Sequence, residues 1–84
     1  MEKLKYVRLE RYNEVIIFPQ VIQHDTFKHL KPVSAGFCII SLATDSVDCW
    51  GESVSLGLSS NKIEDSYYAT KQVFGIDEAD KILK

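Results

Sequence analysis

The sequence has few of the residues that would mark a specialised class of protein. It holds two cysteines, two prolines and four glycines in 84 residues, which excludes a disulfide-dense scaffold, a collagen-like chain and a low-complexity chain. No run approaches the roughly 18 apolar residues of a membrane-spanning helix, and the charged start MEKLKYVRLE is unlike a signal peptide. We therefore expect a single globular domain over residues 1–84, located in the cytoplasm, with Cys38 and Cys49 reduced and buried.

Positive charge is also scarce. Ten lysines and arginines against twelve acids give a formal net charge of -2, whereas a general nucleic-acid-binding protein needs clustered cations to neutralise phosphates. A local basic edge, diluted by glutamates, is formed by Lys3, Lys5, Arg8 and Arg11. The composition therefore predicts neither general nucleic-acid binding nor membrane binding.

The common signatures of catalysis and of cofactor binding are missing. His24 and His29 are five residues apart, about 140° around a helix, so they do not form the one-faced pair of zinc proteases, and we expect both to be exposed. The sequence lacks the G-x-S-x-G nucleophile turn, although GESVS supplies Ser53 and Ser55. It also lacks both glycine-rich nucleotide-phosphate motifs. We predict no catalytic residue, no metal site and no cofactor.

The first half of the chain predicts a hairpin followed by a short helix. Polar and apolar residues interleave from Lys3 to Arg11, and the β-branched and aromatic run VIIF occupies Val15 to Phe18, with Asn13 in the turn between them. In VIQHDTFKHLKP, Asp25 or Thr26 is a suitable helix cap, and a proline ends the segment.

The second half predicts another hairpin and a long helix. The uncharged run from Gly36 to Leu42 predicts a buried strand, and VDCW predicts its antiparallel partner. An even-length loop places Cys38, Ile40 and Leu42 on one face with Val47 and Cys49, and Phe37 and Ile39 on the face of Trp50.

Asn61 is a suitable cap for a helix from Lys62 to Phe74, with Glu64 reaching back and Gly75 ending it. The predicted inward stripe of this helix consists of Ile63, Tyr67, Thr70 and Phe74. Residues 76–84 are expected to form a short terminal helix or a frayed tail. The whole is an α+β fold in ββαββα order, with an antiparallel sheet covered on one face by the long helix and the other face open to oligomer formation.

Small residues with hydroxyl groups gather in PVSAGF and in CWGESVSLGLSS, just before the long helix. A helix N-terminus exposes free backbone N–H groups, which bind phosphates and carboxylates. Small side chains also let a ligand or another backbone approach closely. The predicted ligand-binding residues are Ser34, Gly36, Gly51, Ser53, Ser55, Gly57, Ser59 and Ser60. Turn formation alone is the competing explanation of both segments.

The order IIFP, short polar helix, PVSAGF, apolar strand, GESVSLGLSS and acidic helix resembles a group of small uncharacterised proteins encoded by phages and prophages. The resemblance runs over about Ile16 to Tyr68. It implies a non-enzymatic accessory protein in the host cytosol that acts by binding, for example against a host defence system. The serine and glycine segments favour sequestration of a small phosphate-bearing, nucleotide-like ligand, held between the subunits of a homo-oligomer.

Two other functions stay open. One is an inhibitor of a host defence protein, acting through an acidic and aromatic surface made of Asp45, Asp48, Glu64, Asp65 and Tyr68. The other is a small hydrolase using Ser53 or Ser55, which a domain of this size rarely supports because it offers little concave volume.

Overall fold

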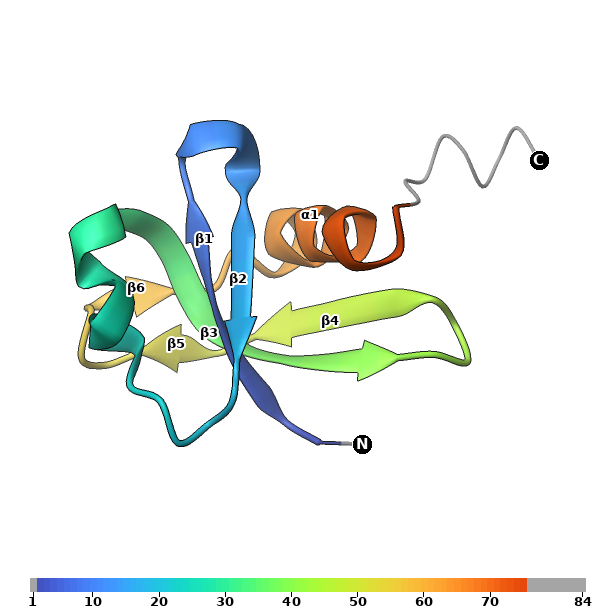
Figure 1. The fold of residues 1–84 in the computed structure, drawn as a ribbon, viewed down its shortest axis with the longest axis horizontal. Coiled ribbons are helices and arrows are strands. Elements are labelled where there is room, and N and C mark those ends of the chain that lie inside the picture. The colour runs from blue at the N-terminus through green and yellow to red at the C-terminus, as the bar shows by residue number, and fades with distance from the viewer. Residues whose placement is uncertain (1, 76–84) are drawn as a thin grey trace.

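The protein has the predicted α+β fold, with a four-stranded antiparallel sheet and a C-terminal helix (Figure 1). The computed structural model describes residues 2–75, so the expectation for residues 76–84 lies outside the described residues. The sheet order is β2-β1-β3-β4. Its strands are β1 (Leu4–Leu9), β2 (Val15–Phe18), β3 (Pro32–Ser41) and β4 (Ser46–Trp50). The other elements are the 3₁₀ helices η1 (Arg11–Asn13) and η2 (His24–Leu30), the short strands β5 (Glu52–Ser53) and β6 (Leu58–Ser59), and the helix α1 (Lys62–Phe74).

The first hairpin is confirmed, and its turn has an unusual backbone. Strands β1 and β2 pair antiparallel, with Val7 opposite Ile16. In the turn both Tyr12 (φ 60°) and Asn13 (φ 50°) adopt the left-handed conformation, which asparagine tolerates and a bulky aromatic residue rarely adopts. The side chain of Tyr12 is 83% exposed.

The second hairpin is confirmed, with Cys38 and Cys49 on one face of the sheet as predicted. Cys38 lies opposite Cys49, and Phe37 lies opposite Trp50. The strand β3 begins earlier than predicted, because Pro32 to Ala35 pair with β1. The segment PVSAGF is therefore part of the central strand and not a loop, and Leu42 lies in the turn with 80% of its side chain exposed.

The predicted short helix is a 3₁₀ helix, and the prediction of Asp25 or Thr26 as its N-cap residue is wrong. Gln23 precedes η2 without a side-chain capping bond, and Lys31 ends it in the left-handed conformation. His24 was expected to be exposed, but only 5% of it is accessible. Its Nε2 lies 2.8 Å from the carbonyl oxygen of Gly36, so the histidine joins η2 to the central strand.

The helix α1 has the predicted bounds and caps, but a different inward face. The Asn61 side chain accepts a bond from the Glu64 amide, and Gly75 ends the helix at φ 70°. The inward stripe is wrong for Ile63, which is 84% exposed, and for Tyr67, which is 37% exposed. It is right for Thr70, which bonds to β4, and for Phe74, which packs against the core. Asp65 and Ala69 are the buried residues of the helix.

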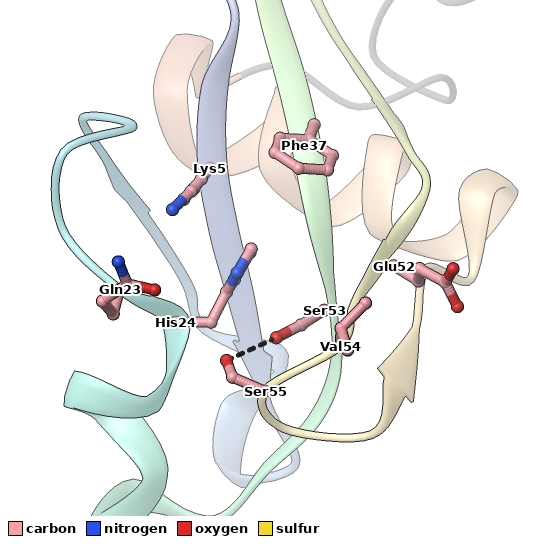
Figure 2. A pocket seen from close by; sticks show the side chains of 8 residues that line it. All are labelled: Lys5, Gln23, His24, Phe37, Glu52, Ser53, Val54 and Ser55. Atoms are coloured by element: carbon pink, nitrogen blue, oxygen red, sulfur yellow. Dashed lines mark hydrogen bonds between the residues drawn. The ribbon is translucent and has the colours of Figure 1, made fainter.

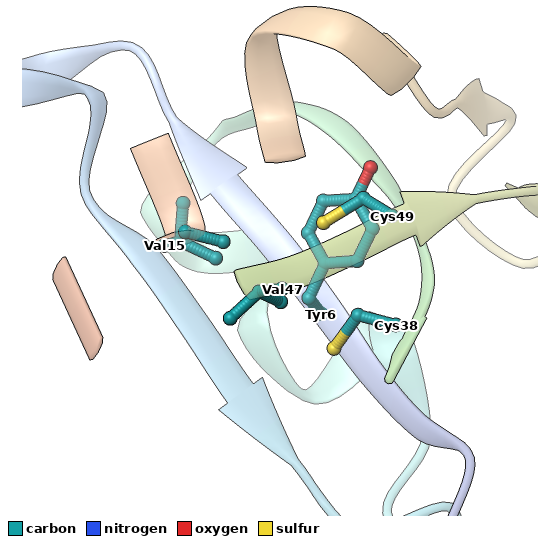
Figure 3. Packing of buried hydrophobic residues seen from close by; sticks show 6 residues of the cluster. Tyr6, Val15, Cys38, Val47 and Cys49 are labelled. Atoms are coloured by element: carbon teal, nitrogen blue, oxygen red, sulfur yellow. The ribbon is translucent and has the colours of Figure 1, made fainter. Parts of the chain in front are cut away.

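Two apolar layers lie on the two faces of the sheet. One layer packs under α1 and contains Tyr6, Val15, Cys38, Val47, Cys49 and Ala69 (Figure 3). The other contains Val7, Phe18 and Ala35, against which side chains from η2 and the β5–β6 hairpin pack. The face that was expected to be open is therefore partly covered by the chain itself.

Polar side chains of α1 bond to both edge strands of the sheet. The hydroxyl of Ser66 accepts a bond from the Cys49 amide at 2.9 Å, and that of Thr70 accepts one from the Val47 amide at 2.9 Å. At the opposite edge, the Gln72 side chain accepts from the Val15 amide at 2.8 Å and donates to its carbonyl. These bonds occupy edge groups that could otherwise pair with another chain. Within residues 2–75, no helix has the length and apolar character needed to cross a bilayer.

Candidate functional site

The serine-rich segment forms a short hairpin of its own, β5–β6. The Leu56 amide donates to the Ser53 hydroxyl at 3.3 Å, and the Gly57 amide donates to the Val54 carbonyl at 3.2 Å. The Ser60 amide donates to the Gly51 carbonyl at 2.8 Å. These three hydrogen bonds stabilise the hairpin, so turn formation explains the small and hydroxyl-bearing residues in this part of the segment.

The N-terminus of α1 is occupied by the chain's own acceptors. The Asn61 amide donates to the carboxylate of Asp65 at 3.0 Å, and the Glu64 amide donates to the Asn61 side chain at 3.5 Å. Glu64 reaches back as predicted, but to the Asn61 side-chain amide at 3.1 Å, and the backbone amide of the cap residue is bonded to Asp65. The prediction of a ligand anion at this helix end is therefore wrong, because the negative charge there is the carboxylate of Asp65, a residue of the protein itself.

Asp65 is the centre of a buried polar cluster that joins α1 to the sheet. Its Oδ1 accepts bonds from Arg8 Nε at 2.5 Å and from Ser34 Oγ at 2.9 Å. Its Oδ2 accepts a bond from the Tyr6 hydroxyl, which also lies 2.5 Å from Ser60 Oγ. Asp65 is fully buried and Arg8 is 9% exposed, so the ion pair is shielded from water.

The cluster controls the ionisation of its tyrosine. Burial, together with the hydrogen bond to Asp65, raises the pKa of Tyr6 well above its ordinary value, because a phenolate would be poorly solvated and would face a carboxylate. The Arg8 guanidinium completes its contacts with Asn13 Oδ1 at 2.9 Å and Glu64 Oε2 at 3.4 Å. All of these Arg8 contacts are with groups of the protein itself, so the cluster stabilises the packing of α1 on the sheet.

The eight predicted ligand residues do not form one surface. Ser34 and Ser60 belong to the buried cluster. A side chain at Gly36 would place its Cβ 2.3 Å from the Trp50 carbonyl oxygen, so this glycine admits a neighbouring backbone and not a ligand. Gly51, at φ 86°, forms a bend between β4 and β5.

The remaining members lie on or beside the β5–β6 hairpin. Gly57 and Ser59 are exposed there, and Ser53 and Ser55 line a groove. These last two line the groove together with residues that were not predicted.

The acidic surface of the alternative inhibitor also needs a correction. Asp65 is inside the protein, and Tyr68 packs against the apolar layer under α1. Asp45, Asp48 and Glu64 remain exposed.

The groove lies between η2, the start of β5–β6 and the uncovered part of the sheet (Figure 2). Its volume is about 540 Å³, which is within the usual range of small-molecule sites. The lining residues are Lys5, Gln23, His24, Phe37, Glu52, Ser53, Val54 and Ser55. They come from four separate segments of the chain, and the figure shows Lys5 and Gln23 on one side of the opening and the two serines below His24.

Positive charge and aromatic rings meet at this groove. The Lys5 ammonium donates one bond to the Ile22 carbonyl at 3.0 Å, which leaves further donor directions of the group. The Lys3 ammonium lies 4.6 Å from the centre of the Phe37 ring. Phe37 also contacts the His24 ring edge-to-face at 5.8 Å and lies 6.5 Å from the Trp50 ring. The groove therefore combines a cation, the exposed Ser55 and an aromatic wall, whereas Ser53 is only 2% exposed and its hydroxyl lies 3.4 Å from Ser55 Oγ.

Sequence reasoning missed both the buried cluster and the groove. Alternation along β1 places Tyr6 and Arg8 on one face and Lys3 and Lys5 on the other. An arginine on the face that meets an amphipathic helix signals an acidic partner on that helix, and this signal could have identified Asp65. Nothing local to His24 or Phe37 indicates that they share a groove.

Comparison of the chain with protein-family models, with curated proteins and with solved structures found no match. Within residues 2–75, no group of three or more histidine, cysteine, aspartate or glutamate side chains is placed to hold a metal ion. The function has to be argued from the groove and its chemistry.

Proposed function

We propose that the protein is a non-enzymatic binding protein that sequesters a small phosphate-bearing, nucleotide-like ligand in the groove between η2 and the β5–β6 hairpin. The resemblance to phage and prophage proteins makes counter-defence in a host cytosol the setting of this proposal. The observation that carries it is the juxtaposition of the Lys5 ammonium with the Phe37 ring and the hydroxyl of the exposed Ser55.

The chemistry of these groups suits the two parts of a nucleotide. An ammonium and hydroxyls bind phosphate oxygens through charge-assisted and ordinary hydrogen bonds, and an aromatic ring offers a stacking surface of about 1 to 3 kcal/mol per base. Glu52 lies at the opposite side of the opening and is exposed. Its carboxylate can accept hydrogen bonds from the amino and hydroxyl groups of such a ligand, and its negative charge disfavours a phosphate group on that side of the groove.

The proposal includes a second copy of the chain. The groove is a shallow surface feature of a small domain, and a ligand gains affinity when most of its surface is buried. A symmetric dimer that closes two grooves against each other would provide this burial. Native mass spectrometry of the purified protein, with and without added ligand, measures both the number of chains and any retained molecule.

The binding test is a thermal-shift titration with nucleoside mono-, di- and triphosphates and with inorganic phosphate. A ligand at 100 times its Kd stabilises the folded state by about 2.7 kcal/mol, and each 1 kcal/mol moves the Tm of a domain of this size by about 4 to 8 °C. We expect Lys5→Gln and Phe37→Leu to remove the shift. Lys62→Gln changes an exposed lysine on α1, beyond the other face of the sheet, and is expected to keep it.

If none of these compounds shifts the Tm of the wild-type protein, the sequestration proposal is wrong. Equal shifts for wild type and Lys5→Gln would remove the groove as the site.

The second candidate function is the protein inhibitor, and one feature favours it. Tyr12 at the tip of the first hairpin is 83% exposed, and the Arg11 guanidinium lies 5.2 Å from its ring centre. Tyrosine and arginine are the residue types that dominate binding energy at protein interfaces. Loss of inhibition of the host defence protein in Tyr12→Ser, together with no ligand-induced Tm shift in the wild-type protein, would support this second function over the first.

A further inference from the structure

The two cysteines of the chain are directly opposite each other on neighbouring strands. Cys38 of β3 pairs with Cys49 of β4, and both are fully buried under α1. Figure 3 shows both side chains beside the ring of Tyr6. They are free thiols in this structure.

The hydrogen bonds of β4 show which kind of antiparallel pair this is. The amides of Val47 and Cys49 donate to Thr70 and Ser66 on α1, so they point away from β3. Residues whose amides point away from the partner strand form the non-hydrogen-bonded pairs of a ladder, in which the two Cα atoms are about 4.5 Å apart. A disulfide joins Cα atoms about 4.4 to 6.8 Å apart, so this pair can be bridged with little movement of the backbone.

The two thiols also differ chemically. A hydrogen bond from Cys49 lowers the pKa of Cys38, because the donated bond favours the thiolate. The same bond and burial raise the pKa of Cys49. This direction of the bond favours attack by Cys38, with Cys49 as the second, resolving thiol.

We propose that Cys38 and Cys49 form a modification site: a dithiol that a low-molecular-weight disulfide converts into an internal disulfide. The Cys38 thiolate attacks the small disulfide, forming a mixed disulfide and releasing one small thiol. Cys49 then loses its proton to solvent, and its sulfur attacks Cys38, releasing the second small thiol. The two cysteines lose two electrons and two protons in total, and the small disulfide is reduced to two thiols.

Access to the pair depends on α1. Both thiols are covered, so reaction requires a local opening in which the helix separates from the edge of β4. The bond between the Ser66 hydroxyl and the Cys49 amide at 2.9 Å is one of the contacts that this opening breaks. Removing it is expected to increase the open fraction and to speed oxidation several-fold.

The test is incubation of the folded protein with millimolar oxidised glutathione, followed by thiol counting, intact mass measurement and peptide mapping without reductant. We expect the loss of both thiols, a peptide that contains Cys38 linked to Cys49, and no retained glutathione. Trp50 follows Cys49 and is the one tryptophan of the chain, so its fluorescence provides a continuous signal that is expected to fall on oxidation and recover with reductant.

Two variants complete the test. Cys49→Ala lacks the resolving thiol and is expected to retain glutathione on Cys38, and Ser66→Ala is expected to oxidise faster than wild type. Retained glutathione on the wild-type protein, or two free thiols until urea unfolds it, would overturn the proposal. These outcomes are independent of ligand binding in the groove.

Discussion

Replacement of Asp65 by asparagine is the sharpest test of how the helix is held on the sheet. Asparagine keeps the shape of the side chain but removes its charge and one acceptor oxygen. Four donors converge on the wild-type carboxylate, from Tyr6, Arg8, Ser34 and the Asn61 amide. In Asp65→Asn at least one of them would face an NH₂ group, and the buried arginine would lose its buried counter-ion and keep only the partly exposed Glu64.

The size of the effect follows from burial. Removing one partner of a buried ion pair costs about 3 to 5 kcal/mol, because an uncompensated charge remains inside. The stability of a protein of this length is roughly 4 to 13 kcal/mol at about 0.05 to 0.15 kcal/mol per residue. Asp65→Asn is therefore expected to lose a large share of the total stability.

Urea unfolding followed by Trp50 fluorescence and circular dichroism measures this loss. With a slope of about 1 to 3 kcal/mol per molar urea, a loss of 3 kcal/mol lowers the midpoint by about 1 M or more. Glu64→Gln is the matched control, since it is the adjacent acid, lies 3.4 Å from the same arginine and has a side chain that is 57% exposed. Its expected cost is below about 1 kcal/mol. Equal and small costs for the two variants would refute the role assigned to the buried carboxylate.

Three further predictions concern single contacts. Tyr6→Phe is expected to lose about 1 to 3 kcal/mol at neutral pH. The pKa of Tyr6 is raised in the folded state from an ordinary value of 10.0, so the unfolded state loses this proton first as the pH rises. The free energy of unfolding of the wild type therefore falls above about pH 10, at up to about 1.4 kcal/mol per pH unit. The difference in unfolding free energy between wild type and Tyr6→Phe, measured by urea titration, should narrow above that pH. Gly36→Ala is expected to lower the Tm through the contact with the Trp50 carbonyl at 2.3 Å, and an unchanged Tm would contradict this close approach. Gln72→Ala leaves the Val15 amide without its side-chain partner and is expected to cost about 1 to 3 kcal/mol and to speed hydrogen exchange at Val15; unchanged exchange would contradict the edge contact.

Local patterns were sufficient for most of the elements. Alternation, β-branched residues and turn residues identified both hairpins, and the period of two together with an even loop placed Cys38 and Cys49 on the same face of the sheet. Asn61 and Gly75 marked the ends of α1 because caps act within a few residues of the helix. These features depend on near neighbours in the chain, which a sequence displays directly.

The inward face of α1 was predicted from apolar periodicity, and this failed for a physical reason. The helix meets the sheet through a charged residue, Asp65, and through polar side chains that bond to strand edges. Periodicity of apolar residues assumes an apolar contact surface. Ile63 is therefore exposed, although its position in the pattern suggested burial.

The candidate site also combines features that the sequence shows with features that only the structure shows. The sequence displayed serines, glycines and a helix start, and from these a phosphate site was a reasonable hypothesis, but it could not show which amides were already bonded. Ser34 and Ser60 are far apart in the chain and join the same cluster, Ser34 by its bond to Asp65 and Ser60 by its bond to Tyr6. The groove joins Lys5 to Ser55 across four segments.

The sequence by itself determined the α+β class, the two hairpins and the limits of the long helix, because propensity, alternation and capping act over a few residues. Only the tertiary structure decided which polar groups were satisfied inside and which remained for a ligand. That outcome depends on pairings between residues up to 59 positions apart, such as Tyr6 with Asp65, and no local pattern carries them.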